Sequence, residues 1–217
     1  MDMQYARTQM VQQQVRAWEV LDPRILAVFE TLPRDAFVPA RYRNLAYADT
    51  AIPLSHGEVM MTPKVEGRLL QALNPQSGES VLEIGTGSGF LTACLARLAG
   101  KVTSVDIHPE FIERAGKTLA DLGVKKVKLE SRDGTRLDWS NQRFDVIAAT
   151  GSLPVYDPAY AAQLSLGGRL FVIVGSSPVM EALLVTRTAE DAWSTESLFE
   201  TDLPALQNAV VPRQFQF

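Results

Sequence analysis

The spacing of hydrophobic residues changes near residue 80. Before that point, apolar positions recur three to four residues apart, which is typical of amphipathic helices. Asp22 followed by Pro23 marks one helix start, because Asp caps the first turn and Pro tolerates the first helical position. Residues 40–63 lack a periodic pattern and are expected to form loops. The pattern predicts helices over residues 5–20, 23–31 and 63–73.

From residue 80 onward, short apolar segments alternate with amphipathic ones. Strands are predicted over residues 80–84, 101–105, 127–131, 144–149 and 169–174. Helices are predicted over residues 91–99, 111–122 and 158–164. Strands that alternate with helices form a parallel sheet with right-handed crossovers. Two last strands, residues 182–187 and 194–200, are separated by a short polar turn and predict a hairpin.

These elements predict an α/β fold with a mostly parallel seven-stranded sheet, an antiparallel C-terminal strand, helices on both faces and an N-terminal helical extension. A chain of 217 residues, 46% of them hydrophobic, can bury a core of that size. We expect residues 1–74 to form a helical and loop region and residues 75–217 to form the ligand-binding domain. The two parts are expected to pack as one compact unit.

The most informative motif is VLEIGTGSGF at residues 81–90, where an apolar strand meets a glycine loop and then a helix. Gly85, Gly87 and Gly89 form a G-x-G-x-G pattern, and glycine permits tight turns and close approach of a ligand. The next strand ends in Asp106, 17 residues past Gly89. Because the carboxyl ends of parallel strands meet at one edge of the sheet, this layout predicts a nucleotide-binding crevice.

The tight glycine spacing, with Glu83 just before it, resembles the S-adenosylmethionine (SAM) loop of the Rossmann-like methyltransferases. The resemblance implies SAM as the cofactor and S-adenosylhomocysteine as its product. We expect free loop amides and the following helix N-terminus to bind the cofactor's carboxylate. Glu83 is expected to attract its ammonium group, directly or through water. Asp106 can accept hydrogen bonds from both ribose hydroxyls.

Residues 10–175 resemble the protein-L-isoaspartate (D-aspartate) O-methyltransferase family. The matching segments are LPRDAFVP at 32–39, LAYADTAIPLSHG at 45–57, SVDIHP at 104–109 and FDVIAAT at 144–150. This resemblance implies methyl transfer from SAM to the free carboxylate of an isoaspartyl residue in a damaged protein. It also implies that Asp133 lies near the adenine amino group. The predicted cofactor-binding residues are Glu83, Ile84, Gly85, Thr86, Gly87, Ser88, Gly89, Asp106, Ile107, Asp133 and Gly134.

The segment after His56 differs from the family pattern, which is like QTISQP. Here residues 58–63 are EVMMTP, so Val59 and Met61 replace two hydroxyl residues and Glu58 replaces a neutral one. We expect His56, Met61 and Thr62 to be the acceptor-side, catalytic positions, with Thr62 offering a hydroxyl one position later. A negative charge near a carboxylate acceptor is unfavourable. Isoaspartyl methylation is therefore expected to be weak or absent.

Two alternatives to isoaspartyl repair stay open. The first is a methyltransferase of another acceptor, possibly a small molecule, because apolar side chains surround the predicted acceptor position. The second is a non-catalytic SAM-binding interaction protein. The sequence does not disclose the oligomeric state.

The composition bears on the cellular compartment and on the classes of binding partner. A net charge of −4 without a basic run argues against a nucleic-acid partner. The single cysteine, Cys94, cannot form an internal disulfide and fits a reducing cytoplasm. We find no apolar run near 18 residues, so no membrane partner is expected. Two histidines and one cysteine suggest no metal site, and His108 is expected at the surface of a helix start.

Overall fold

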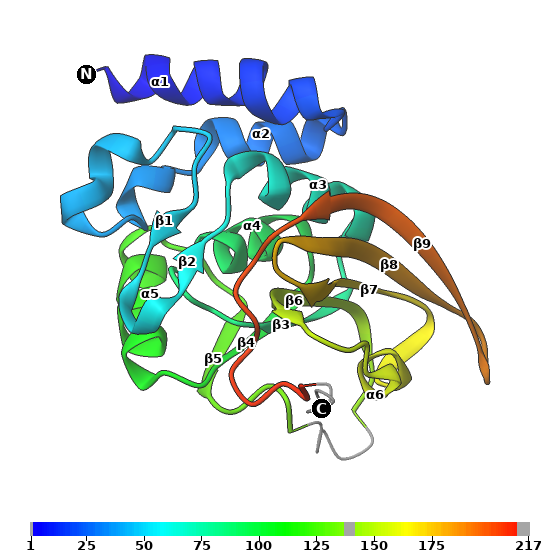
Figure 1. Cartoon of the computed structure of the whole chain (residues 1–217). Coiled ribbons are helices and arrows are strands. Elements are labelled where there is room, and N and C mark those ends of the chain that lie inside the picture. Colours follow the sequence, from blue (N-terminus) through cyan, green and yellow to red (C-terminus); the bar gives the residue numbers. More distant parts are fainter. Residues whose placement is uncertain (1, 137–141, 212–217) are drawn as a thin grey trace.

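A seven-stranded sheet runs through the computed structural model, which describes residues 2–136 and 142–211 (Figure 1). Its order is β5-β4-β3-β6-β7-β8-β9. The strands are β3 (Ser80–Ile84), β4 (Lys101–Asp106), β5 (Val127–Ser131), β6 (Phe144–Leu153), β7 (Leu164–Ser176), β8 (Val179–Ala189) and β9 (Ala192–Thr201). Neighbours from β5 to β7 are parallel, whereas β8 is antiparallel to both β7 and β9. The predicted sheet and its C-terminal hairpin are confirmed.

Helices and short turns fill the connections. They are α1 (Met3–Met10), η1 (Val11–Val15), η2 (Arg16–Trp18), α2 (Pro23–Thr31), η3 (Arg34–Ala36), η4 (Ala40–Leu45), η5 (Ser55–Gly57), α3 (Pro63–Leu73), α4 (Phe90–Leu98), α5 (Pro109–Asp121) and α6 (Pro158–Ala162). A small hairpin pairs β1 (Ile52–Pro53) with β2 (Val59–Met60). The predicted bounds of α2 and α3 are confirmed. The helix predicted over residues 5–20 instead passes from an α-helix into a π turn and a 3-10 turn, and ends where Glu19 adopts a left-handed conformation.

The sheet buries apolar residues on both faces. Consecutive strand residues point to opposite sides, so Val81 joins one hydrophobic cluster while Leu82 joins the other. The first cluster also contains Val15, Phe29 and Leu69 from the N-terminal helices. Figure 1 shows these helices stacked beside the sheet on the side of α3 and α4. A domain boundary at residue 74 stays a prediction, and the hydrophobic core crosses that position.

Phe90 joins the N-terminal region to the sheet. Its ring is 1% exposed and lies edge to face with Phe29 and Phe37, at centroid distances of 5.7 and 5.6 Å. Phe90 also begins α4 directly after the glycine loop, so the residue that packs against Phe29 and Phe37 fixes where the loop ends. Packing of the N-terminal helices therefore helps to hold the ligand-binding edge.

We predict that Phe90→Ala lowers the free energy of unfolding by about 3–5 kcal/mol, because the cavity left between three elements cannot close fully. Urea unfolding followed by far-UV circular dichroism measures the effect. The exposed Tyr5 supplies a control, and Tyr5→Ala should leave stability within about 0.5 kcal/mol. A similarly small loss for Phe90→Ala would show that the N-terminal helices do not depend on this contact.

Candidate cofactor and acceptor site

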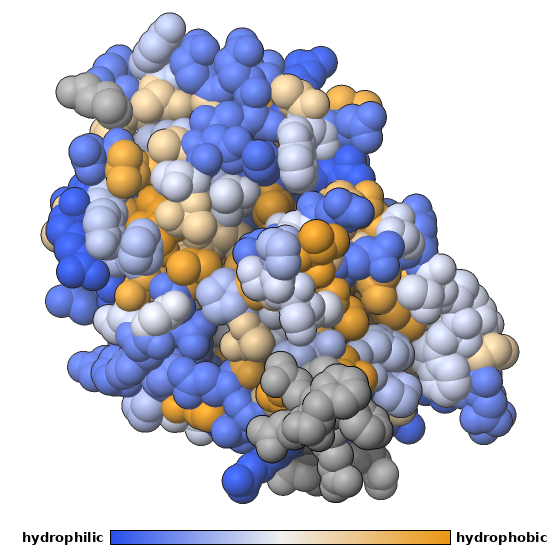
Figure 2. Space-filling view, in the orientation of Figure 1, coloured by the Kyte–Doolittle hydropathy of each residue, from blue (hydrophilic) through white to orange (hydrophobic). Residues whose placement is uncertain are grey.

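An open crevice lies at the carboxyl ends of β3 to β6. Strand order reverses between β3 and β6, which is where open α/β sheets bind their ligands. Figure 2 shows apolar side chains exposed around the β1–β2 hairpin on this face. Predicted residues that line the crevice are Met61, Glu83, Ile84, Gly85, Thr86, Gly87, Ser88, Asp106, Ile107, Asp133 and Gly134.

Glu83 lies at the floor of the crevice and is fully buried. Its Oε2 accepts hydrogen bonds from the hydroxyls of Thr92 and Ser104. Its Oε1 is buried, and no group among the described residues donates to it. Burial raises the pKa of Glu83 to about 8, and the nearby carboxylates of Asp106 and Glu66 act in the same direction. A cationic ligand group would satisfy both the free oxygen and the buried charge.

Asp106 lies beside Glu83 at the end of the neighbouring strand and is 7% exposed. Its two oxygens accept backbone hydrogen bonds from Gly87 at 2.8 Å and His108 at 2.9 Å. A carboxylate has about four acceptor positions, so Asp106 keeps capacity for ligand hydroxyls.

The glycine loop is more internally bonded than predicted. The amides of Gly85 and Thr86 donate to the Val105 carbonyl, and the amide of Gly89 donates to the Thr86 carbonyl. With Gly87 bonded to Asp106, four of the loop amides expected to be free already have partners, so that part of the expectation is wrong. The sequence could not show most of it, because the partners of Gly85, Thr86 and Gly87 come from the next strand.

Two of the three glycines are required by packing. A Cβ on Gly85 would lie 2.2 Å from the Thr150 hydroxyl oxygen, which donates to the Ile84 and Gly85 carbonyls. A Cβ on Gly89 would lie 2.8 Å from that of Ala115 in α5, and Gly89 does not line the crevice. Of the three, only Gly87 has room for a Cβ, which would make an ordinary contact with Leu54 at 3.5 Å. Thr150 was not predicted as a site residue, although a polar residue at the end of a buried strand was an available signal.

Asp133 forms a turn with Thr135, whose amide and hydroxyl both donate to Oδ1. Its Oδ2 accepts from the Asn208 side chain at 3.0 Å. Partial burial opposes ionisation of Asp133, but these hydrogen bonds outweigh it and lower the pKa. Asp133 is therefore held as a carboxylate at the crevice wall.

The C-terminal segment after β9 crosses the crevice, which no sequence pattern predicted. Ser152 anchors the segment through its amide to Pro204 and its hydroxyl to Leu203. Leu206 and Gln207 then line the crevice. Figure 1 shows this segment passing in front of the sheet. The C-terminal segment therefore forms one wall of the crevice, and the predicted residues form much of the lining that faces the sheet.

The acceptor-side loop is held by a buried arginine. Arg34 pairs with Glu66 of α3 at 3.1 Å and donates to the Met61 carbonyl at 2.6 Å. The Met61 side chain lines the crevice and is 6% exposed. Thr62 caps α3 without a side-chain bond, its hydroxyl is buried without a partner among the described residues, and it does not line the crevice. Of the two predicted acceptor-side residues Met61 and Thr62, the structure therefore places only Met61 in the crevice lining.

His56 stands at the rim rather than in the crevice. Its ring stacks on His108 at a centroid distance of 3.9 Å, and its Nε2 lies 3.0 Å from Glu110 Oε1. His108, expected at the surface of a helix start or otherwise near the adenosine edge, lines the crevice and contacts Gln207. The histidines thus connect the acceptor-side loop to the end of β4.

We predict that Glu83→Gln changes how stability depends on pH. The folded-state pKa of about 8 lies above the ordinary 4.5, so the protonated carboxyl is favoured on folding. Relative to Glu83→Gln, the wild type should be most stable below about pH 4.5 and should lose that advantage as pH rises toward 8. Chemical unfolding of both proteins across this range measures the difference. A difference that stays constant with pH would contradict the raised pKa.

Comparisons with known proteins agree with this geometry. The family model of protein-L-isoaspartate(D-aspartate) O-methyltransferase (PCMT) matches residues 5–203. Protein-L-isoaspartate O-methyltransferase 1 of Rhodopseudomonas palustris (strain HaA2) is 37% identical over 193 residues, which are 88% of this chain and 79% of the relative. The protein-L-isoaspartate O-methyltransferase of Anaeromyxobacter dehalogenans (strain 2CP-C) is 41% identical over 174 residues, or 79% and 83% of the two chains.

A solved structure shares the fold. It is a Plasmodium falciparum protein described as a protein-L-isoaspartate O-methyltransferase, crystallised with S-adenosyl-L-homocysteine. It aligns with a TM-score of 0.79 at 15% identity, over 95% of this chain and 99% of that one. Together with the family match over residues 5–203, the sequence relatives establish that this chain belongs to the protein-L-isoaspartate(D-aspartate) O-methyltransferase family.

Proposed function

We propose that this chain is a SAM-dependent O-methyltransferase that acts on the free carboxylate of isoaspartyl residues in damaged proteins. The observation that carries the proposal is the pair of carboxylates at the ends of adjacent strands, with the Glu83 Oε1 buried and unpartnered among the described residues. Membership in the family supports the reaction class.

The crevice fits the cofactor at three places. Glu83 would hold the ammonium group, since a buried carboxylate oxygen without a donor is stabilised by a cation. Asp106 would accept from the ribose hydroxyls, and Asp133 would lie toward the adenine. Gly87 leaves the centre of the loop open. When bound, SAM supplies a methyl group on a positively charged sulfur, already activated for transfer.

The acceptor needs positioning rather than a general base. An isoaspartyl carboxylate is ionised near pH 7 and is itself the nucleophile. The chain's contribution is then to orient the acceptor and to exclude water, effects that can lower a barrier by about 7–11 kcal/mol. Leu54, Met60 and Met61 form an apolar wall on the acceptor side that can exclude water, and Leu206 adds an apolar side chain from the C-terminal segment.

That same wall favours a second candidate function, methylation of a flatter, more apolar acceptor, including a small molecule. Glu58 also lines the crevice, and its Oε1 accepts a 3.2 Å hydrogen bond from Gln207. The bond moderates the negative charge of Glu58 without removing it. The buried unpartnered oxygen of Glu83 argues against a scaffold that binds no cofactor, whereas a non-catalytic SAM-binding protein would use this oxygen as an enzyme does.

The composition supports a cellular compartment and a substrate class. A single buried cysteine and a negative net charge support action in a reducing cytoplasm on protein carboxylates rather than on nucleic acid. Within the described ranges, the longest helices are too short or too polar to cross a bilayer.

We predict that Asp106→Ala weakens binding of S-adenosylhomocysteine by about 1.5–3 kcal/mol, because it deletes charge-assisted hydrogen bonds. Isothermal titration calorimetry measures the change. Asp121→Ala, at the far end of α5, is a control that should bind like the wild type. Unchanged affinity in the Asp106 variant would remove this residue from the site.

We predict slow but isoaspartyl-selective methyl transfer by the unmodified chain, and faster transfer after Glu58→Gln, Val59→Thr and Met61→Ser are combined. The three changes restore hydrogen-bond partners and remove a charge around the reacting group, so they should raise turnover more than cofactor affinity. Transfer of labelled methyl to an isoaspartyl peptide, with the aspartyl peptide as control, measures both.

Two results would oppose this account. Fast transfer by the wild type that the three changes do not improve would show that the loop does not limit the reaction. Tight S-adenosylhomocysteine binding with no isoaspartyl transfer by either protein would favour another acceptor or a non-catalytic SAM-binding role.

A further inference from the structure

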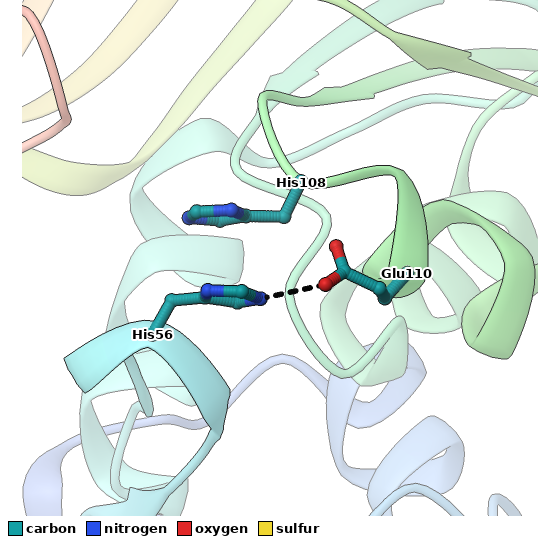
Figure 3. Close-up of side chains that lie close together, drawn as sticks. All are labelled: His56, His108 and Glu110. Carbon is teal, nitrogen blue, oxygen red and sulfur yellow. Dashed lines mark hydrogen bonds and ion pairs between the residues drawn. The ribbon is translucent and has the colours of Figure 1, made fainter.

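Three side chains with metal-ligating atoms meet at the rim of the crevice (Figure 3). His56 comes from η5 in the acceptor-side loop, whereas His108 and Glu110 come from the start of α5. One ligand atom from each residue lies within 4.8 Å of the other two. Residue 56 is far in sequence from residues 108 and 110, so spacing along the chain does not reveal the cluster.

We propose that His56, His108 and Glu110 bind one divalent late first-row transition-metal ion, with Zn²⁺ as the favoured ion. Two imidazoles and one carboxylate are the donor set of zinc sites that keep an open position. Imidazole nitrogen suits Zn²⁺, Ni²⁺ and Cu²⁺, whereas Mg²⁺ prefers oxygen ligands and water.

The distance between His56 and Glu110 suits a zinc site, whereas the two histidine rings must move relative to each other. Tetrahedral ligands about 2.1 Å from zinc lie about 3.4 Å apart. The 3.0 Å between His56 Nε2 and Glu110 Oε1 is already close to that value. The two rings are stacked with only 6° between their planes, so their lone pairs do not converge, and one ring must turn out of the stack.

His56 is the ring that can turn at low cost, because it is exposed, whereas His108 is half-buried and its Nε2 contacts the Gln207 side chain. The side chains of His56 and Glu110 are 35% and 64% exposed. Figure 3 shows the two rings layered over each other, with Glu110 beside the pair. Two carboxylates are linked to the cluster by hydrogen bonds. The His108 amide donates to Asp106, and Gln207 bridges His108 to Glu58. These carboxylates favour a cation at the rim.

A bound ion would join the acceptor-side loop to α5 beside the crevice. Fixing η5 in place should slow exchange of acceptor and product, so Zn²⁺ should inhibit methyl transfer reversibly. This consequence rests on the proposed function, whereas ion binding does not.

The test is calorimetric titration of the metal-free full chain with Zn²⁺, without cofactor or acceptor. We expect saturable binding of one ion per chain. His56→Gln, His108→Gln and Glu110→Gln should each weaken it at least tenfold. Glu113→Gln, an exposed change one turn along α5, should not alter it. Excess Mg²⁺ should not displace the ion.

Titration with Co²⁺ gives a second readout that does not depend on any variant, since Co²⁺ in a tetrahedral four-coordinate site absorbs visible light much more strongly than the hydrated octahedral ion. No saturable Zn²⁺ binding, or equal affinity in the wild type and all three cluster variants, would overturn the site. Binding that leaves methyl transfer unchanged would overturn the inhibitory consequence.

Discussion

The acceptor side of this molecule depends on one buried guanidinium. Arg34 is 0% exposed, pairs with Glu66, and donates to the carbonyls of Ala46 and Met61. Its guanidinium carbon also lies 5.2 Å from the centre of the Phe90 ring. Breaking such a buried pair leaves an uncompensated charge, at a cost of about 3–5 kcal/mol. Burial raises the pKa of Glu66 to about 7, and Arg34 acts in the opposite direction. The network fixes where the acceptor-side loop meets the crevice.

The cofactor side depends on the carboxylates of Glu83 and Asp106, which have different hydrogen-bond partners. Glu83 receives hydroxyl donors on one oxygen only, in a dry position that favours its protonated form unless a cation binds. Asp106 instead receives one backbone donor on each oxygen and keeps acceptor positions for a ligand. Adjacent strands therefore present one group suited to a ligand cation and one suited to neutral hydroxyls. A ligand that carries both a cationic group and hydroxyls can therefore bind in one orientation, with the cation at Glu83 and the hydroxyls at Asp106.

Local patterns predicted the sheet because strand alternation, glycine turns and helix starts are encoded by neighbouring residues. The same patterns placed Glu83, Asp106 and the glycine loop at one edge. They missed Thr150, Leu206 and Gln207, whose positions follow from long-range pairing. The three residues at 56, 108 and 110 meet only because a loop from the N-terminal region lies against α5. Contacts between distant segments leave no periodic trace, and they also decide which loop amides are free.

The central claim is that the crevice binds SAM in one orientation, with its ammonium at Glu83 and its ribose at Asp106. A crystal structure of the full chain with S-adenosylhomocysteine tests it most directly. The account predicts the ligand ammonium within hydrogen-bond distance of Glu83 Oε1, or one water away, and both ribose hydroxyls on Asp106. A ligand bound elsewhere, or bound with its amino end away from Glu83, would contradict it.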